Sequence, residues 1–232
     1  MNRFNHKSLE IVEHNPECLS KNYSELTIRS QSEVAGSQFH LIMQQIGLGL
    51  PVESFLKEYP QIANWVDKVK PFINISGSKQ WSAQLQYLYR QNLLYSEYDL
   101  IVYGENQVVG FDWTIQKPPK FEVLENKWQT QLRLFILHEQ TRMPLEHISL
   151  VYLFVNTGSI YQFTYSKDKY LAFKERLEQT LAPLAINGEN SSSSDLKRNS
   201  FSEIIPQSAH DKWLAKEIST EEYLAAIPEV EI

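Results

Sequence analysis

The sequence contains a single cysteine, Cys18, and this scarcity removes several classes of protein. One thiol cannot form an intramolecular disulfide, and it cannot build a cysteine-clustered zinc site or an iron–sulfur cluster. The sequence also lacks any run of about 18 apolar residues, so we expect no membrane-spanning segment. The stretch Met1–His6 has no apolar core of the kind found in signal peptides. We therefore expect a soluble, cytoplasmic protein.

Positive charge is scarce as well. The chain has 22 Lys and Arg residues against 28 Asp and Glu residues, a net charge of -6 and a pI near 5.6. This balance argues against a protein that coats DNA with a uniformly basic surface, but it leaves open a local basic patch. With 232 residues, of which 42% are hydrophobic and 12% aromatic, the chain is long and apolar enough for one globular domain with an appendage.

Composition changes along the chain predict four parts. Residues 1–30 are polar and weakly patterned, so we expect a weakly ordered N-terminal segment with one short helix. Residues 31–186 carry the periodic apolar patterns of a folded domain. Residues 187–200 contain four consecutive serines and predict a flexible linker. Residues 201–232 predict a short helical C-terminal tail.

Within residues 31–186 the apolar periodicity changes several times between helical and extended spacing. The expected elements are a helix over 33–47, a helix over 52–70 with a kink or break at Pro60, an antiparallel meander over 80–114, a helix over 123–141, a strand over 148–155, a strand over 160–165 and a helix over 168–184. This order predicts an α/β fold with a mixed central sheet and helices on its faces.

The meander carries two carboxylates in apolar surroundings. Residues 98–103 and 108–114 flank a turn with Gly and Asn, which predicts a hairpin that can bring Asp99 beside Asp112. A charged group in an apolar strand is costly unless it is paired or bound to a metal ion. Two adjacent carboxylates resist joint ionisation unless a cation neutralises them, and their hard oxygens suit Mg²⁺ or Mn²⁺. A histidine such as His40 would complete the ligand set.

Four short motifs follow one another on the expected elements. They are Gly36-Ser37-Gln38-Phe39-His40, Tyr98-Asp99, Phe111-Asp112-Trp113 and Gln129-Thr130-Gln131-Leu132-Arg133. In this order they resemble the PD-(D/E)XK nuclease superfamily, and in particular the stand-alone cyanobacterial-type members of its RecB-like branch. The resemblance covers about residues 34–166 and implies a restriction-endonuclease-like core.

The resemblance implies a metal-dependent DNA nuclease that hydrolyses phosphodiester bonds with a metal-activated water. By analogy with the family, His40, Asp99 and Asp112 would bind Mg²⁺ or Mn²⁺, with the carbonyl of Trp113 as a further ligand. Gln129 would help to place the DNA or the attacking water. DNA is then the expected partner, and no membrane is involved.

Three departures from the family pattern matter for activity. Thr114 stands where the family has a lysine that stabilises the pentavalent phosphate, and losing such a cation costs about 3 kcal/mol or more of transition-state stabilisation. Arg133 replaces the family's tyrosine; it lies four residues after Gln129 and hence on the same helix face, from which its guanidinium can enter the site. Arginine brings charge but cannot act as a base. The C-terminal cysteine cluster of several relatives is absent, so no iron–sulfur cluster is expected.

Two alternatives to an active nuclease stay open. An inactive nuclease domain would act as a DNA-binding or scaffolding module in a DNA repair or recombination complex, with a protein of that complex as its partner. A plain interaction protein would bind neither metal nor DNA. Lys117, Lys120 and Lys127 are candidates for a patch that contacts DNA phosphates. Interleaved glutamates such as Glu122 and Glu125 make an ordinary solvated surface an equal alternative.

Overall fold

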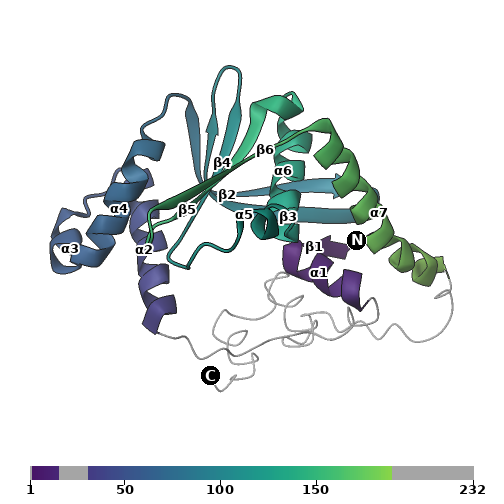
Figure 1. Ribbon diagram of the computed structural model, residues 1–232, viewed down its shortest axis with the longest axis horizontal. Coiled ribbons are helices and arrows are strands. Elements are labelled where there is room, and N and C mark those ends of the chain that lie inside the picture. The colour runs from purple at the N-terminus through teal and green to yellow at the C-terminus, as the bar shows by residue number, and fades with distance from the viewer. Residues whose placement is uncertain (1, 16–30, 190–232) are drawn as a thin grey trace, which may run out of the picture. The chain divides into compact units, whose positions relative to one another are not determined.

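The computed structural model describes residues 2–15 and 31–189 of the chain (Figure 1). The chain divides into two compact units, Met1–Ile186 and Asn187–Ile232, and the architecture below is that of the first. Helix α7 (Lys167–Glu189) continues three residues into the expected linker over 187–200. The remainder of that linker and the expected tail over 201–232 lie outside the described residues.

Six strands form one mixed sheet. Their bounds are β1 Asn2–Phe4, β2 Ser78–Tyr89, β3 Asn92–Tyr103, β4 Val108–Thr114, β5 Ile148–Phe154 and β6 Ser159–Thr164. Strand β3 is the hub, because β2 pairs along one of its edges and both β1 and β4 pair along the other. The β1–β3 and β4–β5 pairs are parallel, and the remaining pairs are antiparallel. The meander predicted for residues 80–114 is confirmed as β2, β3 and β4.

Helices cover both faces of this sheet, each over its own apolar core (Figure 1). One face packs against α2 (Gln31–Gly47) and α4 (Pro60–Ile73), with α3 (Glu53–Glu58) beside them, and we call its core the α2/α4 core. The other face packs against α1 (His6–His14), α5 (Phe121–Glu125), α6 (Trp128–Thr141) and α7, and we call its core the α6 core. The predicted α/β class is confirmed, and the arrangement is consistent with a restriction-endonuclease-like core. None of the described helices combines the length and apolar character that crossing a membrane requires.

The strand β5 lies inside the sheet, between β4 and β6. All seven of its residues are buried, because helices cover it on both faces. The break predicted at Pro60 is also confirmed, since α3 ends before Tyr59 and Pro60 opens α4, where its missing N–H costs nothing. A single turn of 3₁₀-helix, Leu145–His147, leads into β5.

The single helix predicted over 123–141 is wrong, since the structure has α5 and α6 with a break at Asn126 and Lys127. The backbone of Lys127 is extended there (ψ 144°), and the Asn126 side-chain amide donates to the Glu122 carbonyl. Arg176 of α7 also donates to the carbonyl of Asn126. Apolar spacing could not reveal this break, because local polar bonds and a distant arginine hold it.

The N-terminal segment contributes more than the expected short helix. Strand β1 pairs with the first residues of β3, in the register Phe4 to Leu94, and Phe4 is fully buried. Helix α1 has a capping box in which Asn5 and Ser8 each bond the other's backbone N–H. Residues 16–30, which also belong to the segment predicted as weakly ordered, lie outside the described residues.

A close approach of α2 to β2 generates a stability prediction. A Cβ at Gly47 would lie 2.4 Å from the Trp81 ring, and that ring is itself packed near Trp113. We expect Gly47→Ala to lower the free energy of unfolding by about 1–3 kcal/mol, because the rigid ring must move. Urea denaturation measures the difference.

The matched control is Gly36→Ala in the same helix. Its new methyl would meet the flexible end of Ile115 at 3.3 Å, and alanine favours a helix over glycine by about 0.5–1 kcal/mol. We therefore expect Gly36→Ala to stay within about 1 kcal/mol of wild type. A Gly47 variant as stable as the control would contradict the packing described for Trp81.

Candidate active site

A fork between β3 and β4 places the candidate site. The two strands pair only from Leu100–Phe111 to Tyr103–Val108, after which β4 continues along β5. Farther down the same edge of β3, β1 pairs with residues 92–94. Residues 95–99 of β3 therefore have no strand partner on this edge. Polar groups of the chain converge on this gap.

Asp99 bridges the fork at the point where pairing ends. Its Oδ2 accepts the backbone N–H of Trp113 at 2.8 Å, so the carboxylate replaces the next ladder bond. Its Oδ1 forms a hydrogen bond of 2.9 Å with Nδ1 of His40 on α2. The neighbouring Phe39 is fully buried and anchors that turn of the helix. Both oxygens of Asp99 are thus held in fixed directions.

Asp112 is paired with a buried cation. Nη2 of Arg133, on α6, donates to Asp112 Oδ1 at 2.9 Å, and the arginine side chain is only 8% exposed. Its Nε donates to the Glu97 carbonyl at 2.8 Å and its Nη1 to the Tyr152 hydroxyl at 3.2 Å. Burial opposes the charge, but Asp112 and Tyr152 outweigh it and raise the pKa of Arg133. The guanidinium therefore stays charged, and it satisfies the Glu97 carbonyl on the edge of β3 that has no strand partner.

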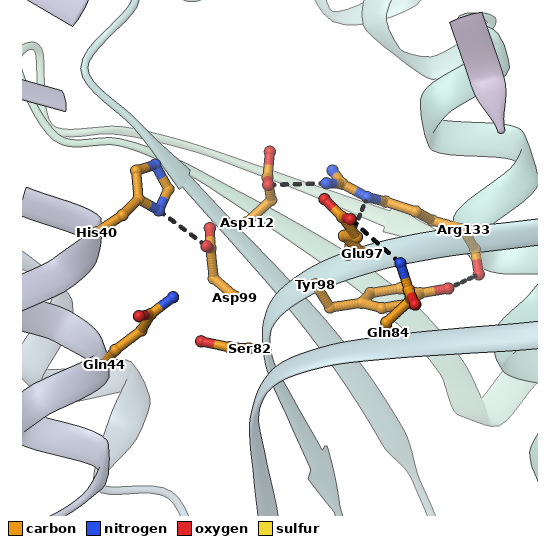
Figure 2. Close-up of a pocket in the computed structure, with 9 residues that line it drawn as sticks. All are labelled: His40, Gln44, Ser82, Gln84, Glu97, Tyr98, Asp99, Asp112 and Arg133. Carbon is orange, nitrogen blue, oxygen red and sulfur yellow. Dashed lines mark hydrogen bonds and ion pairs between the residues drawn. The ribbon is translucent and has the colours of Figure 1, made fainter. Parts of the chain in front are cut away.

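These groups face one pocket of about 470 Å³. Figure 2 shows Asp99 and Asp112 lying between His40 and Arg133. The pocket is lined by His40, Gln44, Ser82, Gln84, Glu97, Tyr98, Asp99, Asp112 and Arg133. Three acidic residues thus share the pocket with one arginine and one histidine.

The pKa shifts reflect this crowding of charge. Burial raises the pKa of Asp99; the bond to His40 opposes that shift and the charge of Asp112 adds to it. Burial acts against a charged His40, but the bond to Asp99 and the two carboxylate charges prevail and raise the pKa of His40. Both shifts favour a proton held between Asp99 and His40. Perturbed groups of this kind cluster at functional sites.

The structure brings together four of the residues singled out in the sequence and leaves the others outside the pocket lining. His40, Asp99, Asp112 and Arg133 line it. Trp113 contributes its backbone N–H, while its side chain is buried in the α2/α4 core. The Thr114 hydroxyl accepts the backbone N–H of Gln116 instead of entering the pocket. Residues outside the lining are the half-buried Gln129 and the exposed Lys117, Lys120 and Lys127.

The donor groups suit a divalent cation only in part. Across residues 2–15 and 31–189, no three His, Cys, Asp or Glu side chains are gathered closely enough to hold a metal ion. Mg²⁺, however, is usually bound through only one or two carboxylates, with waters and substrate phosphates completing its shell. Asp112 Oδ2 forms no hydrogen bond with any described residue, so the Asp99–Asp112 pair fits this mode.

Several lining residues were missed in the sequence. Gln44 lies four residues after His40 on α2, so helical spacing could have indicated it. Ser82 and Glu97 could not be found this way, because they lie on strands β2 and β3 and only the tertiary structure brings them to the pocket. His6 of α1 was missed as well. Burial and the charge of Arg133 lower its pKa to about 4, with Asp112 acting in the opposite sense, so the field of the ion pair reaches α1.

Comparisons with known proteins give no family for this chain. No family description matches the sequence, and no curated protein matches it. Among solved structures, a "Putative exonuclease" from Eubacterium rectale superposes with a TM-score of 0.45 at 12% identity over 78% of this chain and 76% of the other. The structure of SSO0001 gives a TM-score of 0.40 at 17% identity over 82% and 78%. Likenesses this distant assign neither a family nor an activity.

The buried ion pair yields a stability prediction. Arg133→Met removes the cation and leaves Asp112 charged at a mostly buried position, which costs about 3–5 kcal/mol. Urea denaturation should show this loss, and adding Asp112→Asn should recover part of it because the orphaned charge disappears. The matched control is Arg90→Met. Both side chains of the Arg90–Glu178 ion pair are exposed, so its loss should lower the free energy of unfolding by less than about 1 kcal/mol. Equal losses for the two arginines would contradict a buried pair at Asp112.

The bond between His40 and Asp99 predicts a pH dependence of stability. The folded-state pKa of His40 lies above its ordinary value of 6.5. Its stabilising contribution is therefore complete below pH 6.5 and is lost as the pH rises through the higher folded value. The side chain is 40% exposed, so we expect less than about 1 kcal/mol. Between pH 6 and pH 8 the urea midpoint of wild type should fall more than that of His40→Gln. An equal change in the two proteins would contradict the bond between His40 and Asp99.

Proposed function

We propose that the protein is a metal-dependent DNA nuclease of the PD-(D/E)XK type, related to the RecB-like branch. One observation carries the proposal: Asp99 and Asp112 face a single pocket at the fork between β3 and β4, flanked by His40 and Arg133. Paired carboxylates can hold a divalent cation, and such a cation can activate water for phosphodiester hydrolysis.

The chemistry that Mg²⁺ or Mn²⁺ supplies at such a carboxylate pair is polarisation of a phosphate oxygen and a lower pKa for bound water. Asp99 and Asp112 would hold the cation, and the Trp113 carbonyl and the free ring nitrogen of His40 are the further candidate ligands. The Trp113 N–H and His40 Nδ1 both bind Asp99. They therefore fix the direction of its carboxylate before substrate arrives, which reduces the cost of reorganisation.

Arg133 would take the role that the lysine has in relatives. Its three bonds, to Asp112, Glu97 and Tyr152, occupy one hydrogen on each guanidinium nitrogen. Nη1 and Nη2 each keep one further N–H, which can be directed to a phosphate oxygen. A cation held in place before the charge develops stabilises the transition state without a cost of reorganisation. Since Arg133 does not deprotonate, the proton from the attacking water would pass to a carboxylate.

The wider contacts with DNA are proposals of the same kind. Gln129 begins the helix that carries Arg133, and Lys117, Lys120 and Lys127 lie on the exposed loops leading to that helix. Cations along this path would track the phosphates of a strand that enters the pocket. Binding through them would weaken steeply as salt rises.

A second function, that of an inactive DNA-binding or scaffolding module in a repair or recombination complex, is favoured by one specific observation. Asp112 is already neutralised by Arg133, and Thr114, in place of the lysine, is bonded to the local backbone. A site whose carboxylate is paired internally has less need of a metal ion. This alternative predicts DNA binding with a salt dependence and no cleavage.

Cleavage of end-labelled single- and double-stranded DNA distinguishes these functions. We expect wild type to cut with Mg²⁺ or Mn²⁺ and to stop when EDTA is added. Asp112→Asn should lose at least about 100-fold in rate, because it removes a metal ligand while keeping the shape. Arg133→Lys should retain more activity than Arg133→Met, since lysine keeps the positive charge, although it loses the planar guanidinium group.

Thr114→Lys provides the decisive control. Residues 112 and 114 share a strand face, so a lysine at 114 can reach the site. If wild type is silent and Thr114→Lys cuts, the natural protein is the inactive module. Activity that survives both EDTA and Asp112→Asn would exclude the metal-dependent mechanism.

A further inference from the structure

Strand β3 exchanges its two faces in the middle of its length. Tyr98 is packed in the α6 core, while Leu100, two residues on, is buried in the α2/α4 core. Alternate residues of a regular strand share one face, so this pair should have pointed to the same side. The exchange therefore takes place at Asp99.

Strand β2 makes the same exchange at the residue opposite. Trp81 packs against the α2/α4 core, whereas Ala83 is buried in the α6 core. Pairing runs from Trp81–Leu100 directly to Ala83–Tyr98 without a change of register, and no ladder pair joins the two residues between them. Those two residues are Ser82 and Asp99.

The backbone of Ser82 accounts for the exchange in β2. Its φ is +46°, in the left-handed region that non-glycine residues seldom adopt, and it lies inside a strand. One left-handed residue turns the chain about its axis, so the side chains beyond it project to the other face. Such strain is costly and persists where the surrounding structure enforces it, often at functional sites.

The Ser82 side chain does not account for this conformation. It is exposed at the wall of the pocket (Figure 2) and forms no hydrogen bond with any described residue. The strained backbone thus has no local polar bond as its cause. What it does achieve is a change of direction at Asp99, whose two oxygens then reach Trp113 N–H and His40.

We propose that Ser82 is a positioning residue: its left-handed backbone turns the β2–β3 hairpin at the position of Ser82 and Asp99, and this turn sets the direction in which the Asp99 carboxylate enters the pocket. The effect of Ser82 on DNA cleavage rests on the proposed function, whereas its effect on the position of Asp99 does not depend on that function. A residue tolerant of positive φ should preserve the arrangement, and a β-branched residue should oppose it.

The backbone amide of Trp113 reports the position of Asp99 directly, because its N–H donates to that carboxylate. We would measure its hydrogen–deuterium exchange by NMR in the full-length chain. The internal reference is the Val155 amide. It donates to the carbonyl of Thr114, the last residue of β4, at 2.9 Å. A general loss of stability accelerates both amides, whereas displacement of Asp99 accelerates Trp113 alone.

Four substitutions test the backbone of Ser82. Ser82→Gly and Ser82→Asn tolerate positive φ and should leave Trp113 exchange at the wild-type rate. Ser82→Val should accelerate it about tenfold relative to Val155, the change expected when a bond to a charged group is lost. Ser82→Ala should give a Trp113 exchange rate between those of the glycine and valine variants. If the valine variant does not fold, the comparison of Ser82→Ala with Ser82→Gly tests the proposal instead. Gln86→Val, at an exposed β2 position with ordinary φ, controls for a β-branched residue.

Two results would overturn the proposal. One is an unchanged Trp113 rate in both Ser82→Val and Ser82→Ala. The other is equal acceleration in the glycine, asparagine, alanine and valine variants, which would assign the effect to the lost hydroxyl or to the substitution as such. The same variants then enter the cleavage assay, where we expect Ser82→Gly to match wild type and Ser82→Val to be slower. A silent wild type would refute the nuclease and leave the exchange result intact.

Discussion

The early separation of β4 from β3 is the constraint on which the rest of the site depends. After the pair Leu100–Phe111, β3 has no strand on this edge until β1 joins it at residues 92–94. Buried backbone groups without partners are costly, and side chains supply the missing bonds. Asp99 accepts the Trp113 N–H and Arg133 donates to the Glu97 carbonyl. The residues proposed to act on DNA thus also complete the divided sheet.

Stability alone does not explain the charges at this fork. Replacing a buried ion pair with apolar groups of similar volume is often neutral or stabilising, because two charges must be taken out of water. The Arg133–Asp112 pair is buried on the arginine side and lies in the same pocket as the His40–Asp99 bond. A bound cation would give two carboxylates at this place a function. This supports a binding or catalytic role for the pocket.

Much of the site followed from local pattern. The hairpin signal placed Asp99 beside Asp112. Arg133 was expected in the site through its spacing from Gln129, and the structure places Arg133 in the pocket lining but leaves Gln129 outside it. The missed features depend on distant contacts. Strand β1 joins the sheet through residues about 90 positions away, the break at Asn126 is held partly by Arg176, and the strained φ of Ser82 has no signal in residue type.

The sequence by itself determined most of the elements and the hairpin partners, because side-chain periodicity and turn residues act over a few positions. It therefore determined that two aspartates lie side by side between helical layers. Only the tertiary structure decided what those aspartates bind. Arg133 reaches Asp112 across 21 residues and His40 reaches Asp99 across 59, and the face exchange at Ser82 sets the direction of the latter carboxylate. Such choices depend on how packed layers orient charges that water no longer screens, and no local pattern encodes that.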